Sequence, residues 1–111
     1  MDVDIAFDID ESQIHEAYKS VIYRIVQESL NNAVKYSQAT TAKVTLSDHN
    51  DAIHLSITDN GIGFDQTTIQ EKLGLGLMSM SERAESVRGK MEIEAAIDQG
   101  VEIRASFPMV Q

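Results

Sequence analysis

Apolar residues in this chain recur with two different periods, and the order of these periods limits the fold to few classes. Apolar and polar residues alternate in five segments, at about residues 3–9, 44–46, 53–59, 91–97 and 101–107. Such alternation is typical of strands that bury one face. Two further segments, about 10–37 and 74–87, space their apolar residues three and four apart, as amphipathic helices do. The pattern predicts a two-layer α/β sandwich with a mostly antiparallel sheet.

Length and composition predict one acidic domain. A chain of 111 residues is long enough for one hydrophobic core and too short for two, so residues 1–111 are expected to form a single domain. The net charge of -9 argues against binding to nucleic acid or to anionic membranes, because both need a basic surface. Phosphate binding would therefore need local help from a lysine, a helix N-terminus or a divalent cation.

Cysteine content and hydropathy predict the cellular environment of the chain. It contains no cysteine, which excludes disulfides and thiolate metal sites and fits a reducing compartment. No apolar run approaches the ~18 residues of a membrane span, and no signal-peptide core is present. The chain is therefore expected to be soluble.

The stretch Glu28-Ser-Leu-Asn-Asn-Ala-Val-Lys-Tyr36 carries a polar stripe on the first helix. At ~100° per residue, Glu28, Asn32 and Lys35 fall within a sector of ~60°, and Tyr36 closes its end. The adjacent face is apolar and is formed by Ile22, Val26, Leu30 and Ala33. A polar stripe beside a buried face can meet a partly dehydrated ligand. The alternative is a solvated helix face with ordinary charge pairs.

Asp59 ends the third alternating segment in the same parity as Ile57, so its side chain is expected to point toward the core. A carboxylate in that position needs hydrogen-bond donors. The following Asn60-Gly61 could form a two-residue hairpin turn. However, Ile62-Gly63-Phe64-Asp65 does not alternate as the second strand of a hairpin would. Residues 65–73 are instead expected to form a short mobile loop.

Gly74-Leu-Gly76 opens the second helix, whose apolar positions are Leu77, Met80, Ala84 and Val87. Glycines that lead into a helix N-terminus suit phosphate, because the free N–H groups and the helix dipole both favour anions. Alone, this signal is weak. Met78, like Met80, is expected to pack in the core or under the mobile loop.

Turn signals separate the remaining elements. Asp10 to Ser12 can cap the first helix. Asp48-His-Asn-Asp51 and Asp98-Gln-Gly100 are typical of hairpin turns, and Pro108 is expected to end the last strand. The solvent face of the sheet is expected to carry His54, Glu92, Glu94, Glu102 and Arg104.

Three of these features, in this order, resemble the ATP-binding domain of the GHKL superfamily, which groups gyrase-type, Hsp90-type, histidine-kinase and mismatch-repair ATPases. Glu28 to Tyr36 resembles the N box, Asp59-Asn-Gly-Ile-Gly-Phe64 the G1 box, and Gly74-Leu-Gly-Leu77 the G2 box. Tyr23-Arg-Ile-Val-Gln-Glu28 and Met80-Ser-Glu-Arg83 resemble the nitrate-sensor class of sensor histidine kinases. The resemblance runs from about residue 15 to Pro108 and implies the Bergerat fold, with about three helices on a mixed five-stranded sheet.

The resemblance also implies a role for each box. Asn32 and Glu28 would hold Mg²⁺ or its water, and Lys35 would add charge at the phosphates, which makes Glu28 and Lys35 the expected catalytic residues. Asp59 would accept a hydrogen bond from the adenine amine, and Tyr36 would pack against the adenine. The other implied nucleotide contacts are Gly61, Ile62, Gly63, Gly74, Leu75, Gly76 and Leu77.

The implied function is to bind Mg-ATP and to position its γ-phosphate for transfer to a histidine on a separate dimerisation domain of the same kinase, with a response regulator downstream. His15, His49 and His54 lie outside such an acceptor segment and are expected at the surface. The fragment alone is thus expected to be monomeric, cytoplasmic and unable to phosphorylate itself, and it could be the cytoplasmic part of a membrane-bound sensor. The alternatives are an anti-sigma-type serine kinase and a non-catalytic ATP-binding module.

Two departures from the family pattern stand out. Arg88-Gly89 occupies the place where Gly-Gly is usual, and Gly100-Val101 the place where Gly-Thr is usual. In the family that threonine belongs to the hydrogen-bond network around the adenine-binding aspartate. Its absence here puts the base contacts in question.

Overall fold

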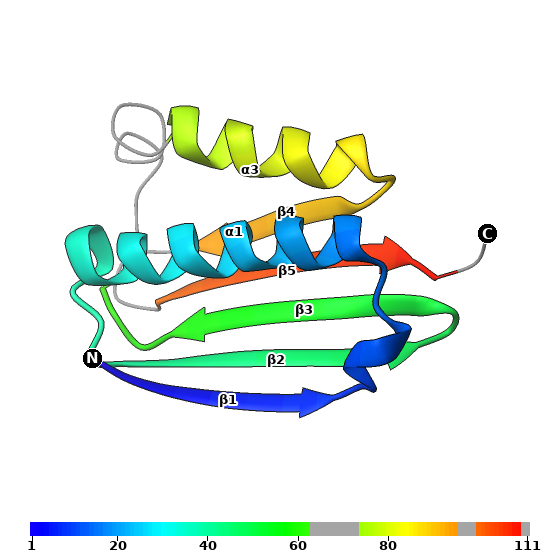
Figure 1. The fold of residues 1–111 in the computed structure, drawn as a ribbon. Helices are drawn as coiled ribbons and strands as arrows, with labels where there is room; N and C mark the ends of the chain where they lie inside the picture. The colour runs from blue at the N-terminus through cyan, green and yellow to red at the C-terminus, as the bar shows by residue number, and fades with distance from the viewer. Residues whose placement is uncertain (63–73, 96–99, 110–111) are drawn as a thin grey trace.

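The computed structural model describes residues 1–62, 74–95 and 100–109, which form one sheet covered on one face by a layer of helices (Figure 1). The strands are β1 (Asp2–Asp8), β2 (Thr41–His49), β3 (Ala52–Asp59), β4 (Lys90–Ala95) and β5 (Val101–Pro108). Their order is β1-β2-β3-β5-β4; β1 and β2 are parallel and the other neighbours antiparallel. The predicted sandwich with a mixed, mostly antiparallel five-stranded sheet is confirmed.

The helix layer is built from α1 (Glu16–Asn32), a π-helical turn η2 (Ala33–Ser37) that continues it, and α3 (Gly74–Ser86). A short 3-10 helix, η1 (Glu11–Gln13), precedes them. The helix α3 contacts both α1 and β4, and α1 also contacts β3. No helix in the described part of the chain is long and apolar enough to cross a membrane.

The predicted first helix is divided, so the predicted cap near Asp10 belongs to a different element. Asp10 caps η1: its Oδ1 accepts from the Ser12 Oγ at 2.8 Å and from the Ser12 N–H at 2.9 Å, and these two hydrogen bonds lower the pKa of the Asp10 carboxyl. Ile14 and His15 are extended, and Ile14 is buried in the core. The helix α1 then starts with its own cap, the His15 Nδ1, which accepts from the Ala17 N–H at 3.1 Å.

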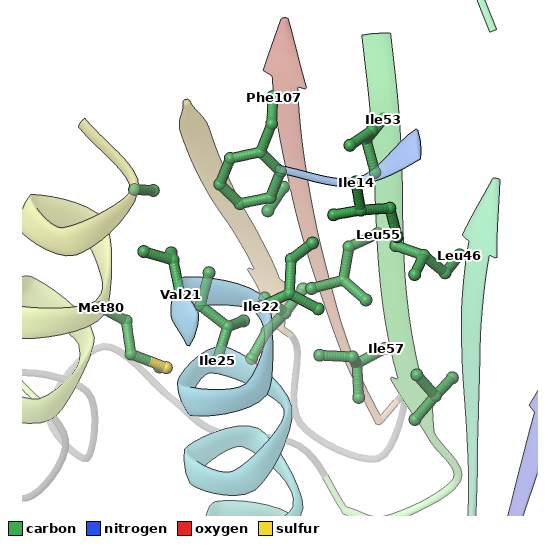
Figure 2. Packing of buried hydrophobic residues seen from close by; sticks show 14 of the residues in the cluster. Ile14, Val21, Ile22, Ile25, Leu46, Ile53, Leu55, Ile57, Met80 and Phe107 are labelled. Atoms are coloured by element: carbon green, nitrogen blue, oxygen red, sulfur yellow. The ribbon is translucent and has the colours of Figure 1, made fainter. Parts of the chain in front are cut away.

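The core lies between the helix layer and the three central strands. In Figure 2, Ile53, Leu55 and Ile57 of β3 point toward α1, and Met80 of α3 closes one side. Strand β5 buries every second residue as predicted, namely Val101, Ile103, Ala105 and Phe107. Met91 and Ile93 of β4 pack against this core in partly buried positions. Met78, expected in the core or under the loop, is instead 58% exposed.

The expectation that the first strand buries one face is wrong. All seven residues of β1 are exposed, including Ile5 at 58% and Phe7 at 53%. The parallel register sets Val3, Ile5 and Phe7 beside Ala42, Val44 and Leu46, which are buried on the helix side of β2. The apolar row of β1 faces the same side, but α1 and α3 cover the strands further along the sheet (Figure 1).

The strand connections follow the predicted turns where they are described. Asn50 and Asp51 adopt φ of 51° and 58°, in the left-handed region that a tight hairpin between β2 and β3 requires. Strands β4 and β5 pair antiparallel as a hairpin would, although residues 96–99 lie outside the described residues. Because β3 has β2 on one side and β5 on the other, the hairpin alternative at Asn60-Gly61 is excluded.

Four of the residues predicted on the solvent face of the sheet form an ionic cluster. The Arg104 guanidinium lies 2.7 Å from Glu94, 3.0 Å from Glu102 and 3.3 Å from Glu92. Hydrogen bonds to Glu94 and then Glu92 raise the pKa of Arg104. These side chains are exposed, so the cluster contributes little to stability.

Candidate functional site

Asp59 points toward the helix layer, as its parity with Ile57 predicts. Its Oδ1 accepts two hydrogen bonds, from the Ser37 Oγ at 2.9 Å and from the Gly61 N–H at 2.9 Å. Ser37 ends η2 and is fully buried. No other described residue donates to this carboxylate, so among these residues only its Oδ1 is bonded. Sequence reasoning missed Ser37, because nothing in its local pattern marks a serine at the end of a helix as the partner of a strand residue.

The loop after β3 is pinned to η2 and to the start of β2. The Ile62 N–H donates to the Ser37 carbonyl at 2.7 Å, and the Asn60 Oδ1 accepts from the Thr40 and Thr41 N–H groups at 3.0 and 2.9 Å. A Cβ at Gly61 would overlap the Ser37 Oγ and carbonyl oxygen, so only glycine permits this close approach. Ile62 is 44% exposed, and Gly63 lies outside the described residues.

The polar stripe on α1 is present in part. Asn32 is only 6% exposed and Glu28 is half-buried, while Lys35 is exposed. The reason is η2: a π-helical turn has more residues per turn than an α-helix, so residues after Asn32 depart from the rotation expected at ~100° per residue. The same change in rotation turns Ser37 to the buried side of the helix.

The buried face of α1 is also rotated from the predicted one. Val26 and Leu30 are only partly buried, and the fully buried positions of α1 are Val21, Ile22, Ile25, Ser29 and Asn32. The Asn32 amide therefore lies deeper than the rim position expected for it. No hydrogen bond joins its side chain to any residue in the described ranges. An amide at this position, with no hydrogen bond to the described residues, can contact a bound ligand.

Glu28 lies against the first turn of α3. A Cβ added to Gly76 would lie 2.9 Å from the Glu28 Oε1, so glycine lets the two helices approach at this point. A hollow of about 150 Å³ lies there, and its lining comprises Arg24, Gln27, Glu28, Gly76, Ser79, Met80 and Arg83. As predicted, α3 begins at Gly74 and its Leu77 is buried. Gly74 and Leu75 belong to the same first turn, which also presents the free N–H groups of a helix N-terminus.

The departure at Gly100-Val101 lies directly beside Asp59. Val101 pairs with Asp59 across β5 and β3, and its side chain is buried. Gly100 has φ of 74°, and a Cβ there would overlap the Asp59 carbonyl oxygen. An apolar side chain thus stands next to the carboxylate. Tyr36 is partly buried against the core at the end of α1.

Two groups of predicted residues are therefore brought together, and Asn32 lies on the helix that joins them. Asp59, Gly61 and Tyr36 gather around η2, and Glu28 meets Gly76 one helical turn before Asn32. A separate hollow of about 550 Å³, lined in part by Gln13, Tyr18, Arg88 and Met109, lies away from all of these residues. That Asn32 and Asp59 contact the same bound nucleotide, as the family resemblance implies, stays a prediction.

Comparison with known proteins identifies the family. The chain matches the model of the family described as histidine kinase-, DNA gyrase B-, and HSP90-like ATPase over residues 18–111. It is 37% identical over 91 residues to the oxygen sensor histidine kinase NreB of Staphylococcus carnosus. It is 33% identical over 107 residues to the sensor histidine kinase LiaS of Bacillus subtilis. These matches cover 82% and 96% of this chain but only 26% and 29% of the two relatives.

Solved structures confirm the fold. The histidine kinase domain of a blue-light activated histidine kinase from Erythrobacter litoralis matches with a TM-score of 0.77 at 13% identity, covering 96% of this chain and 55% of that one. Full-length ShkA, solved in complex with AMPPNP, matches with a TM-score of 0.73 at 20% identity, covering 96% of this chain and 25% of that one. Because the family match extends over most of the sequence, this chain belongs to the histidine kinase-, DNA gyrase B- and HSP90-like ATPases.

Proposed function

We propose that this chain is the ATP-binding catalytic domain of a sensor histidine kinase of the nitrate-sensor class. It would bind Mg-ATP and position the γ-phosphate for transfer to a histidine on a separate dimerisation domain, with a response regulator downstream. The observation that carries the proposal is the Asp59 carboxylate, held on one oxygen by Ser37 and Gly61, in a chain of this ATPase family. Both curated relatives are named sensor histidine kinases.

Asp59 suits the recognition of adenine. A carboxylate in fixed orientation can accept a hydrogen bond from the exocyclic amine of adenine, whereas guanine would present its O6 acceptor to the same oxygen and be repelled. Gly61 lets the backbone approach the flat base, and Ile62 and Tyr36 offer apolar surface. The preference of the site for adenine would follow from this one carboxylate.

The residues near the start of α3 suit the phosphates. The helix N-terminus at Gly74 and Gly76 offers N–H groups to anions. Within residues 1–62, 74–95 and 100–109, no three His, Cys, Asp or Glu side chains gather to hold a metal by themselves. That fits Mg²⁺, which is usually bound by one or two protein ligands together with phosphates and water, and which would neutralise phosphate charge. Asn32 and Glu28 are the ligands we assign, and Lys35, at the surface beyond them, would add positive charge.

The phosphoacceptor has to come from outside this domain. His15 caps α1 through its Nδ1. His49 and His54 lie together at the β2–β3 hairpin, where the His54 Nε2 is 3.3 Å from the His49 carbonyl oxygen. That hairpin is at the end of β3 opposite Asp59. Phosphoryl transfer depends mainly on positioning and on neutralising charge. The residues that we assign to the nucleotide and to Mg²⁺ can supply both for transfer to a histidine on another domain.

A nucleotide melting experiment tests the proposal. ADP or ATP with Mg²⁺, at ~100 times the dissociation constant, should stabilise the domain by ~2.7 kcal/mol and raise its melting temperature by ~10 °C. Asp59→Ala should weaken ADP binding ~5 to 150-fold, and Asn32→Ala should remove the dependence on Mg²⁺. Ser86→Ala, which changes an exposed serine at the end of α3, is the control. An unchanged response to ADP in Asp59→Ala would refute the adenine assignment.

Transfer chemistry separates this function from its closest alternative. The domain should phosphorylate a histidine-bearing dimerisation domain added in trans, and the product should lose its phosphate in acid. An anti-sigma-type serine kinase would instead give an acid-stable phosphoserine. A non-catalytic module would bind nucleotide and label neither.

A further inference from the structure

The described residues bury only three polar side chains, and all three lie on one continuous helical element. They are Ser29 at 4% exposure, Asn32 at 6% and Ser37 at 0%. Every other buried side chain in the described ranges is apolar. Ser29 and Asn32 are three residues apart on α1, and Ser37 ends η2, so the three follow one another along the buried side of this element.

Ser29 differs from every other buried polar group in the described structure. Its Oγ is the one buried side-chain oxygen or nitrogen there that has no hydrogen-bond partner. A serine inside a helix often bonds to the carbonyl four residues earlier, and Ser29 does not. A buried hydroxyl without partners loses its hydrogen bonds to water and gains none, so the free protein carries a cost at this position. Such a group calls for an explanation in terms of function or of a bound molecule.

The position of Ser29 points to a ligand. Ile25, one turn earlier on the same side of α1, is fully buried in the core, so this face of the helix is turned inward. Asn32, the neighbour of Ser29 on the stripe, is 6% exposed, and its amide makes no hydrogen bond within the described part of the chain. Ser37, next along the stripe, is bonded to Asp59. The unpartnered hydroxyl is thus the inner continuation of the row of side chains to which we assigned the nucleotide.

We propose that Ser29 is a further nucleotide-binding residue, whose hydroxyl forms a hydrogen bond with the purine base, either directly or through one buried water. This rests on the proposed function. The base is the part of the nucleotide that fits this position, because phosphates carry charge and stay close to water and cations, whereas the Ser29 hydroxyl is buried away from water. A hydroxyl can donate or accept, so it can match either kind of atom on the edge of the base.

The test compares Ser29→Ala with Ser29→Cys and with Ser86→Ala. Each variant is melted without ligand, and its dissociation constant for Mg-ADP is measured by calorimetry well below its melting temperature. Ser29→Ala should melt at or above the temperature of the parent, because it removes no hydrogen bond from the free protein. It should bind ADP ~5-fold or more weakly, the equivalent of one neutral hydrogen bond. Ser29→Cys should resemble Ala, because a thiol fills similar space but bonds weakly.

Each remaining outcome decides against the inference. If Ser29→Ala and Ser29→Cys bind ADP like the parent, the hydroxyl does not contact the base. A lower melting temperature with unchanged ADP affinity would mean that Ser29 holds an internal water that serves only the free fold. Ser86→Ala, whose Oγ donates to the Arg83 carbonyl at 2.6 Å, should change neither quantity by more than the error. If the parent itself fails to bind ADP, the proposed function fails first, and that result is distinguishable from a failure of Ser29 alone.

Discussion

Ser37 orients the Asp59 carboxylate although the two residues are 22 positions apart in the sequence. The hydroxyl is fully buried, and its bond to Asp59 joins the end of the helix to the end of a central strand. The same residue accepts a hydrogen bond from Ile62 through its carbonyl. One serine therefore links η2, β3 and the loop that follows β3.

Ser37→Ala should accordingly affect both stability and binding. The variant loses a buried hydrogen bond to a carboxylate, so we expect the free energy of unfolding to fall by about 1.5–3 kcal/mol. ADP affinity should also fall, because Asp59 would keep, among the described residues, only the Gly61 N–H as a donor and would be less fixed. Urea unfolding and calorimetry measure the two effects. A change in stability below about 0.5 kcal/mol, as expected for an ordinary surface substitution, would show that the bond contributes nothing.

The inward direction of Asp59 could be predicted from the sequence, but its hydrogen bond with Ser37 could not. Asp59 continues the alternation of Ile57, and side chains in a strand alternate strictly, so its inward direction could be inferred from parity alone. Ser37 could not be inferred, because its position depends on the π-helical turn at Ala33–Ser37. That turn is a departure from regular helix geometry that no periodicity of the sequence marks.

At the scale of elements, the connection from α3 to β4 explains the departure at Arg88-Gly89. Arg88 adopts φ of 68°, the left-handed region in which glycine is favoured. A Cβ at Gly89 would lie 2.5 Å from one ring carbon of Phe107. The Gly89 N–H also donates to the Ala84 carbonyl at 2.7 Å, which closes the end of the helix. Glycine would thus be favoured at position 88 for its backbone, where this chain has arginine, and it is needed at position 89 for space.

Substitutions at these two positions should have opposite signs. Arg88→Gly removes the strain of a side chain in the left-handed region, and we expect the free energy of unfolding to rise by up to about 1 kcal/mol. Gly89→Ala forces a methyl group against the buried ring of Phe107 and should lower it by about 1–3 kcal/mol. Urea unfolding of both variants makes the comparison. Equal effects of the two would contradict this account of the turn.

The helix boundaries were predicted less well than the strands, for a physical reason. Strand direction and facing are fixed by alternation, so β2, β3 and β5 buried the residues expected of them. The start of α1 depends on whether Ile14 continues the helix or turns into the core, and its apolar side chain permits both. The rotation of α1 depends on its packing, which buries Ser29 and Asn32 in preference to the more apolar Val26 and Leu30. That preference for polar residues inside is what a ligand site predicts.

At the scale of the whole molecule, the two layers do not match in width. The helices α1 and α3 contact β3 and β4, and β1 lies at the free edge of the sheet with its apolar row exposed. Its alternation of Val3, Ile5 and Phe7 with aspartates and alanine is the same signal as that of a half-buried strand. Sequence alone could not show that the helix layer ends before reaching it, because coverage is a property of the assembled layers.

Substituting Phe7 and Phe107 tests this difference in coverage, because the same side chain occurs at the edge and near the centre of one sheet. Phe107 is fully buried, so Phe107→Ala should lower the free energy of unfolding by about 3–5 kcal/mol. Phe7 is 53% exposed, and Phe7→Ala should lower it by about 1 kcal/mol or less, because only part of the ring leaves water on folding. Urea unfolding at several protein concentrations measures both. If the loss at Phe7 approaches that at Phe107, the row on β1 is covered in solution. A midpoint that rises with protein concentration would then identify a second copy of the chain as the cover, since association stabilises the folded state by mass action.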